Sequence, residues 1–231
     1  MKRFYKKVSV AEADGGWRVL LDGRAIKTAQ GAAQVVPTPA LAEALAEEWR
    51  AQGEEIDLKL FALRDAVDFA LDLVAPDPRE TIERILAFAE TDTLCYRGDP
   101  DEPLFARQQE VWEPLLTACE HRHDVRFERI SGIIHRAQPP ETLARLRSHV
   151  ERFDPFTLSA LQALSSLSAS LVIALEALRE GTDGAALWDA ANLEELWQIE
   201  LWGEDFEAKA RREKRGAEFA RAMTLAELVR G

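Results

Sequence analysis

Cysteine is scarce in this chain, with two residues among 231, Cys95 and Cys119. A small secreted protein held together by disulfides needs a larger set of cysteines, so that class is excluded. One disulfide remains arithmetically possible. Both cysteines lie in apolar stretches with helical spacing, however, and we therefore expect two buried thiols.

Long hydrophobic runs are also missing. The longest near-continuous apolar run extends from Leu167 to Leu178 and is interrupted by two serines and a glutamate, so it is too short to cross a bilayer. The basic residues that begin the chain are followed by no long apolar stretch, and we expect no signal peptide. The sequence therefore predicts no membrane insertion and a location in the bacterial cytoplasm.

The chain lacks an excess of positive charge, because its net charge is −12. Nucleic-acid binding needs a basic surface for the phosphates, so nucleic acid is not expected as a partner. The charge is uneven, since residues 1–36 and residues 208–231 each carry seven basic and three acidic side chains. Either these basic ends complement the acidic middle within the fold, or the acidic middle forms a docking face.

The Gly-rich motifs that bind phosphate groups are absent as well. The chain contains neither G-x-x-x-x-G-K-[ST] nor G-x-G-x-x-G, and it lacks the G-x-S-x-G turn of serine hydrolases. Nothing in the sequence predicts a nucleotide or any other cofactor, and we expect a protein that is not an enzyme.

The first part of the chain has the periodicity of β-strands. Residues 3–36 alternate between apolar and polar side chains and contain turn signals at residues 14–16 and 22–23, which predicts a small meander. Thr38 and Pro39 form a helix start, and Gly53 ends that helix. A meander of this size must pack on something, and the helix over residues 38–52 is the nearest candidate.

From residue 60 onward the apolar residues follow helical spacing. Helices are expected over residues 61–74, 79–91, 141–153, 156–180 and from 193 onward. The most apolar of them, 156–180, should be central in a bundle. Residues 125–134 form a candidate strand that would add to the N-terminal sheet. The predicted fold class is α+β and mainly α, with a β-rich domain over residues 1–59 and an α-helical (orthogonal) bundle over residues 60–231.

Two stripes run along the helix expected after the loop at residues 181–184. Leu193, Leu196, Trp197 and Leu201 share one face, which is typical of a core stripe. A second line contains Trp188, Glu195, Gln198 and Trp202 and mixes indoles with polar groups. This line is either part of an ordinary amphipathic helix or a docking face, and we expect the helix to continue past Gly203.

The second stripe also carries a motif, E-x-x-Q-x-x-x-W-G-x-D at residues 195–205. Five further motifs precede it in the chain: R-F-Y-K at 3–6, L-D-G-R-x-x-K-T at 21–28, E-W-x-x-Q at 48–52, D-x-L-x-Y-R at 92–97 and Q-x-x-x-W-x-P at 108–114. In this order they resemble the assembly chaperones that bind the alpha subunit of F-type ATP synthase.

This resemblance implies a function without catalysis. A chaperone of this family binds the free alpha subunit, whose interface is exposed, and covers that interface until the beta subunit displaces the chaperone. By this resemblance the partner-binding residues are Glu194, Glu195, Gln198, Trp202 and Asp205. We expect the free protein to be a monomer.

The competing hypothesis is an enzyme, a metal-dependent helical-bundle hydrolase that uses His121, His123 and Asp124. Such enzymes need a further upstream histidine, and none precedes His121. Zinc binding by Cys119, His121 and His123 is disfavoured because the middle residue points away from the other two on a helix. We therefore expect no metal site.

Overall fold

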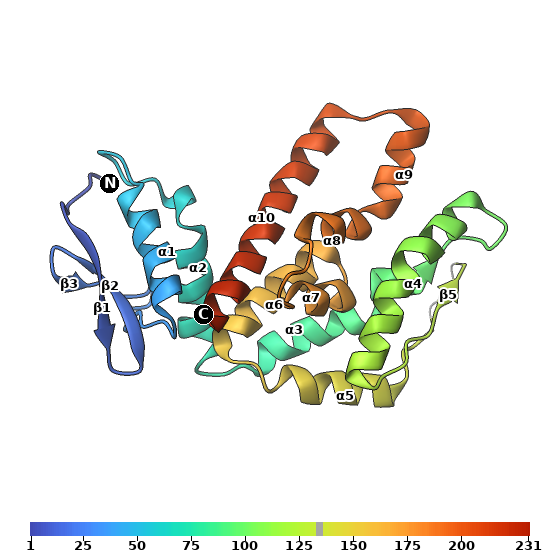
Figure 1. The fold of residues 1–231 in the computed structure, drawn as a ribbon, viewed down its shortest axis with the longest axis horizontal. Coiled ribbons are helices and arrows are strands. Elements are labelled where there is room, and N and C mark those ends of the chain that lie inside the picture. Colours follow the sequence, from blue (N-terminus) through green and yellow to red (C-terminus); the bar gives the residue numbers. More distant parts are fainter. Residues whose placement is uncertain (133–135) are drawn as a thin grey trace. The chain divides into compact units, whose positions relative to one another are not determined.

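The computed structural model describes residues 1–132 and 136–231. The strands are β1 (Val8–Ala13), β2 (Gly16–Leu21), β3 (Arg24–Ala25), β4 (Tyr96–Arg97) and β5 (Ile130–Ser131). The α-helices are α1 (Pro39–Arg50), α2 (Ala62–Phe69), α3 (Arg79–Glu90), α4 (Pro103–His123), α5 (Pro140–Val150), α6 (Pro155–Ser168), α7 (Leu171–Ala177), α8 (Gly184–Ala191), α9 (Leu193–Trp202) and α10 (Phe206–Arg230). Short turns of other helix types are η1 (Leu58–Leu60), η2 (Ala70–Val74) and η3 (Thr93–Cys95). The predicted fold class, α+β and mainly α, is confirmed (Figure 1).

Contacts divide the chain into two compact units. Unit 1 consists of Met1–Arg79, Asp154–Ala160 and Thr224–Gly231, and unit 2 consists of Glu80–Phe153 and Leu161–Met223. The sequence placed the boundary between residues 59 and 60, whereas the first continuous segment of unit 1 extends to Arg79 because α2 packs against α1. Among the described residues, no helix combines the length and apolar character that a membrane span requires.

Unit 1 contains an antiparallel sheet in the order β1-β2-β3, with α1 packed on β1 and β2 (Figure 1). The Thr38 hydroxyl accepts a hydrogen bond from the Leu41 N–H at 3.1 Å and so caps α1, as its sequence predicts. Residues 3–7 are not part of β1, because Arg3 and Tyr5 bind the end of α1 and the N–H groups of Lys6 and Lys7 donate to the Asp22 carboxylate. The Tyr5 hydroxyl donates to the Trp49 carbonyl at 2.6 Å, and Arg3 donates to the Gln52 carbonyl at 2.6 Å.

Unit 2 is built around α4, which contacts α5, α7 and α9. The predicted central helix over residues 156–180 is instead two helices, α6 and α7, separated at Ala169, whose φ is +51°. The break is held by the cap and the first residue of η3, and Ser170 caps α7 by accepting the Ile173 N–H. Asp92 accepts the Val172 N–H at the start of α7 at 2.9 Å, and Thr93 donates to the Ala169 carbonyl.

The candidate strand over residues 125–134 was wrong in its pairing. Within the described residues, only Ile130 and Ser131 of this segment are strand, and they pair in parallel with Tyr96 and Arg97. The N-terminal sheet contains β1, β2 and β3, so β5 belongs to a separate two-stranded pair. The expected continuation over residues 133–134 lies outside the described residues.

Both cysteines are buried free thiols, as the sequence predicts. Burial raises the pKa of the Cys95 thiol and raises that of Cys119 to about 12. Thiolates are the reactive form of cysteine, so these thiols are packing residues rather than nucleophiles.

Candidate functional site

The candidate partner-binding segment consists of α9 and the turn that joins it to α10. The predicted continuation of the helix past Gly203 is wrong, since Gly203 has a φ of +87° and ends α9 at Trp202. Its N–H donates to the Ile199 carbonyl at 2.8 Å. A residue with a side chain rarely adopts this backbone conformation, which explains why glycine stands here.

The turn exposes three large apolar side chains, which we call the apolar tip: Leu201, Trp202 and Phe206. Their exposed fractions are 55%, 77% and 81%. Leu201 was predicted on the core stripe, and that prediction is wrong because α9 is covered only along part of its length. On the same stripe Leu193 is buried, whereas Leu196 and Trp197 are half-buried. Large apolar side chains gathered in solvent are typical of a binding surface.

A groove of about 450 Å³ lies between α4, α8 and α9, and its lining residues on α9 end at Glu200, before the apolar tip. Val111, Leu196, Trp197 and Ile199 supply its apolar walls, and Glu200 stands among its lining residues. The groove and the tip therefore present apolar surface along the same helix.

The acidic residues of the segment have partners within the chain. Glu195 has a side chain that is 41% exposed, and its Oε1 accepts a hydrogen bond from Arg212 Nη1 at 2.8 Å. Arg212 also pairs with Glu204, which raises the pKa of Arg212 and lowers that of Glu204. Glu194 accepts a hydrogen bond from Gln108 of α4 at 2.8 Å, so it helps to fix α9 on α4.

The remaining predicted site residues fall into two groups. Gln198 and Trp202 are exposed on α9. Asp205 accepts the Ala208 N–H at 2.8 Å and caps the first turn of α10. The structure thus brings Glu195, Gln198 and Trp202 to one segment, and it gives Glu194 and Asp205 local structural contacts.

Trp188 does not continue the second stripe, because it lies on α8 rather than α9. Its ring packs on Phe219 of α10, with 5.5 Å between the ring centroids, and the guanidinium of Arg215 lies 5.8 Å from its centroid. Phe206 was missed as a candidate. The sequence contained a signal for it: Gly203 can end a helix and Asp205 can cap the next one, and together they place Phe206 in the first turn of a new helix.

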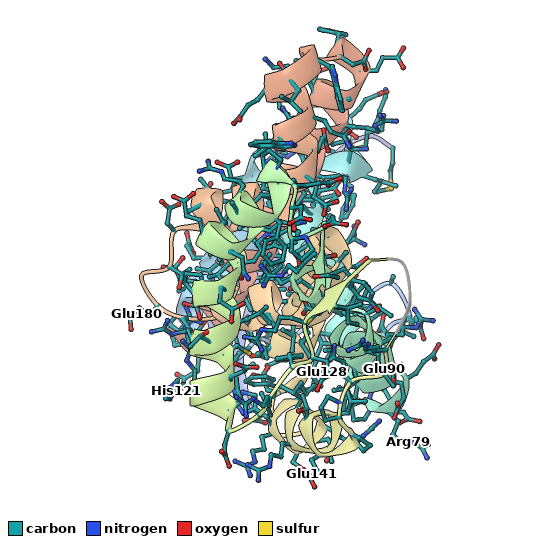
Figure 2. All side chains as sticks on the ribbon, turned by 90° about the vertical axis from the view of Figure 1, so that its right-hand side faces the viewer. Arg79, Glu90, His121, Glu128, Glu141 and Glu180 are labelled. Atoms are coloured by element: carbon teal, nitrogen blue, oxygen red, sulfur yellow. The ribbon has the colours of Figure 1, made fainter. Side chains whose placement is uncertain are left out.

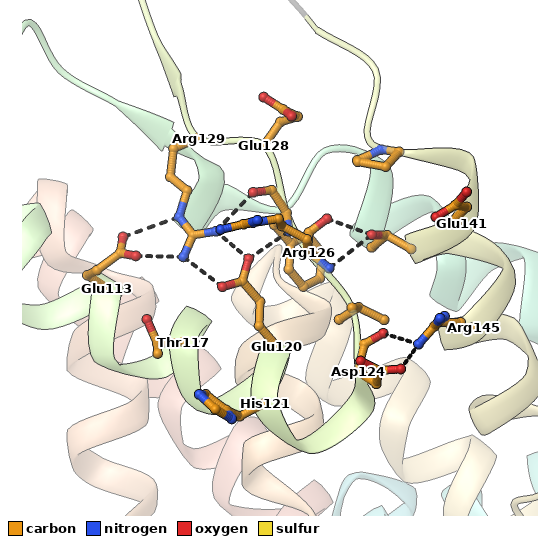
Figure 3. A pocket seen from close by; sticks show the side chains of 14 residues that line it. Glu113, Thr117, Glu120, His121, Asp124, Arg126, Glu128, Arg129, Glu141 and Arg145 are labelled. Carbon is orange, nitrogen blue, oxygen red and sulfur yellow. Dashed lines mark hydrogen bonds and ion pairs between the residues drawn. The ribbon is translucent and has the colours of Figure 1, made fainter.

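Of the residues in the competing hydrolase hypothesis, His121 and Asp124 line a separate cavity of about 1100 Å³ in unit 2 (Figure 3), whereas His123 lines another cavity. Arg129 lies between Glu113 and Glu120 and pairs with both. Although burial lowers the pKa of Arg129, the hydrogen bonds with Glu120 and Glu113 raise it overall. Hydrogen bonding with Arg129 lowers the pKa of Glu113. Both carboxylates therefore already have an arginine partner within the chain.

The two histidines and Asp124 do not converge. His121 is exposed on α4 (Figure 2). The His123 ring packs on the ring of His149, with 4.4 Å between the ring centroids. Burial, with a contribution from His149, lowers the pKa of His123 to about 4. Asp124 pairs with Arg145. Within residues 1–132 and 136–231 no cluster of three metal-ligating side chains is present.

Comparisons with known proteins agree with the sequence motifs. The family described as ATP12 chaperone protein matches residues 2–120. The chain is 25% identical over 214 residues to the mitochondrial protein atp12 of Schizosaccharomyces pombe, covering 87% of this chain and 74% of that protein.

Solved structures are similar over nearly the whole chain. Atp12 from Paracoccus denitrificans is 34% identical with a TM-score of 0.93, covering 99% of this chain and 98% of that one. The Atu1473 protein from Agrobacterium tumefaciens is 36% identical with a TM-score of 0.93, covering 99% of this chain and 86% of that one. This chain therefore belongs to the ATP12 chaperone family.

Proposed function

We propose that this protein is an assembly chaperone of F-type ATP synthase that binds the free alpha subunit. It covers the subunit interface of alpha and is displaced when the beta subunit arrives. The observation that carries this proposal is the apolar tip, because Leu201, Trp202 and Phe206 lie in solvent on the segment whose motif resembles the family. Family membership supports a chaperone role, and the choice of the alpha subunit rests on the resemblance.

The apolar tip has the chemistry of an interface hot spot. Aromatic side chains dominate binding energy where neighbouring groups exclude water from them. Trp202 and Phe206 are the aromatic anchors, and the groove beside α9 offers a place for an apolar side chain of the partner. Glu195 and Gln198 supply polar contacts at the edge of this surface. Such a surface binds without ATP, as a chaperone that is displaced by a neighbouring subunit requires.

The hydrolase hypothesis receives less support. His123 faces His149 at a different cavity from the one that His121 and Asp124 line, and Asp124 is paired with Arg145. The relatives found by the comparisons include proteins of the chaperone family. We therefore propose that the protein is not an enzyme, that it needs no cofactor, and that it is a monomer when free.

The relatives also bear on location. The solved structures come from bacteria, whereas the curated relative in fission yeast is mitochondrial. We place this protein in the bacterial cytoplasm.

The decisive experiment is co-expression with a tagged alpha subunit and measurement of the amount of chaperone that co-purifies. Trp202→Ala combined with Phe206→Ala should reduce capture by at least about tenfold, since hot-spot aromatics contribute about 2 kcal/mol each. Leu58→Ala is the control, because Leu58 is a large exposed apolar residue in unit 1, 66% exposed against 77% and 81% for the two aromatic residues. Addition of the beta subunit should release the chaperone. Equal capture by the double variant and the parent would remove the apolar tip from the binding surface.

A further inference from the structure

Unit 1 contains a second cavity that the proposed function does not use. Its volume is about 540 Å³. It is lined by residues of two family motifs, R-F-Y-K at residues 3–6 and L-D-G-R-x-x-K-T at residues 21–28, together with residues of α1 and α2. We call it the N-terminal groove.

The N-terminal groove has an aromatic and apolar floor. Tyr5 and Trp49 are buried and pack edge to face with 5.5 Å between ring centroids, and Leu21 and Ile26 add aliphatic surface. Phe4 lines the same groove and is 64% exposed. A large aromatic ring in solvent beside an apolar cavity is a typical feature of a binding site.

The rim of the groove is basic although the chain as a whole is acidic. Arg24 and Lys27 are exposed at the rim, and the guanidinium of Arg64 lies 5.7 Å from the centroid of the Trp49 ring. Asp22 is the acidic lining residue, and its carboxylate accepts the backbone N–H groups of Lys6 and Lys7. The charge of the rim therefore complements an acidic ligand.

An unpaired strand edge and an unpaired indole N–H indicate the kind of ligand that the groove would bind. In the described part of the chain, β3 pairs with β2 on one side, and Lys27, just beyond β3, forms an isolated bridge with Ala33, so the unpaired edge is confined to Arg24 and Ala25. The Trp49 indole N–H is buried and, among the described residues, has no hydrogen-bond acceptor. A free strand edge binds an extended peptide through main-chain hydrogen bonds, and a buried donor is costly until it finds an acceptor.

We propose that the N-terminal groove binds an extended acidic segment of the partner, with an apolar side chain in the groove and carboxylates at Arg24 and Lys27. The main chain of the segment pairs with β3 at Arg24 and Ala25. This inference rests on the proposed function, because the segment belongs to the ATP synthase subunit that the protein chaperones. It adds a second contact, made by unit 1, to the contact made by the apolar tip of unit 2.

The test uses the full-length protein and a fluorescent, end-blocked nine-residue peptide of alternating glutamate and valine. Fluorescence anisotropy should show saturable binding. Arg24→Glu combined with Lys27→Glu should weaken it by at least about tenfold, because attraction becomes repulsion. The matched control is Lys2→Glu with Arg18→Glu, which changes the net charge equally at exposed positions outside the groove.

The following outcomes would overturn the inference. The first is no saturable binding of the peptide at concentrations up to about 1 mM, which is the weak limit of specific recognition. The second is equal binding of a peptide that has glutamine in place of glutamate. The third is an equal loss of peptide affinity in the control variant. Light scattering that shows a dimer dissociated by the peptide would instead assign the groove to a second copy of this chain. The Trp202→Ala/Phe206→Ala variant should still bind the peptide.

The two proposals can fail separately. A parent protein that captures the alpha subunit but not the peptide overturns the groove alone. A parent protein that binds the peptide through Arg24 and Lys27 but never captures the alpha subunit overturns the proposed function and retains the groove.

Discussion

Arg212 of α10 donates a hydrogen bond to Glu195 of α9, with 2.8 Å between Nη1 and Oε1. The same guanidinium pairs with Glu204 in the turn between the two helices. Arg212 thus ties α9 to the first turns of α10 and holds the apolar tip between them. A basic or amide group of a partner that approaches Glu195 competes with Arg212 for this carboxylate.

Glu195→Lys should separate a docking role from a structural role. The pair with Arg212 is partly exposed, so its loss should lower the free energy of unfolding by about 1 kcal/mol or less. Binding of the alpha subunit should weaken by about 2 kcal/mol, roughly 30-fold, because the new charge repels a basic partner group. Urea unfolding and a binding titration on one purified variant measure both quantities.

Glu180→Lys is the control for this change, since Glu180 is exposed in unit 2 away from α9 (Figure 2). It should leave both quantities unchanged. A Glu195→Lys protein that unfolds early, or that holds the alpha subunit as tightly as the parent, would return Glu195 to a structural role.

Gln108 links Gly98, the residue after the D-x-L-x-Y-R motif, to α9 and should matter for stability. Its side chain accepts the Gly98 N–H at 2.8 Å and donates to Glu194 at 2.8 Å, and it is fully buried. Gln108→Leu leaves both groups without this partner and should lower the free energy of unfolding by about 1–3 kcal/mol. Gln109→Leu, at the exposed neighbouring position, should change it by less than about 0.5 kcal/mol. Similar urea midpoints for the two variants would contradict the proposed link.

Gly216 of α10 should not accept a side chain. A Cβ atom there would lie 2.9 Å from Trp188 Nε1, and the indole is packed against Phe219 and Arg215. Alanine normally stabilises a helix by up to about 1 kcal/mol, but overpacking should outweigh this gain and destabilise by about 1–2 kcal/mol. Gly53→Ala, outside the helices, is the control for the steric contact alone, because its nearest contact would be 3.9 Å away. A higher melting temperature for Gly216→Ala would show that Trp188 moves freely.

The sequence predicted the features that depend on local chemistry. Alternation and the Asp22-Gly23 turn predicted β2 and β3, and Thr38 with Pro39 predicted the start of α1. The motif at residues 195–205 led to the exposed part of α9. These features depend on backbone preferences and short-range spacing, which can be read without knowledge of distant contacts.

Features that depend on distant contacts were not predicted. The break at Ala169 is held by Asp92 and Thr93, which bond to residues 80 and 76 positions later in the chain. Ser170, which caps α7 by accepting the Ile173 N–H, is a local signal for a helix start that was overlooked. The pairing of β5 with β4 likewise joins segments 34 residues apart. Leu201 has the spacing of a core residue, but whether its face is covered depends on where α4 and α8 end beside α9.

Asp92 makes the stability of unit 2 depend on pH. Burial raises the pKa of Asp92 to about 6, although its carboxylate accepts the N–H groups of Leu94 and Val172. The folded protein therefore binds this proton more tightly than the unfolded chain, whose aspartate has a pKa near 3.9. As the pH falls from about 6 to 4, this group increases the free energy of unfolding by about 3 kcal/mol in total, and below pH 4 its contribution stays constant.

Urea unfolding of the parent and of Asp92→Asn across this pH range measures the effect, because the asparagine cannot titrate. The parent should gain stability relative to the variant as the pH falls, whereas carboxylates paired with arginine, such as Glu113, act in the opposite direction in both proteins. A constant difference between the two proteins from pH 7 to pH 4 would show that Asp92 has an ordinary pKa in the folded state.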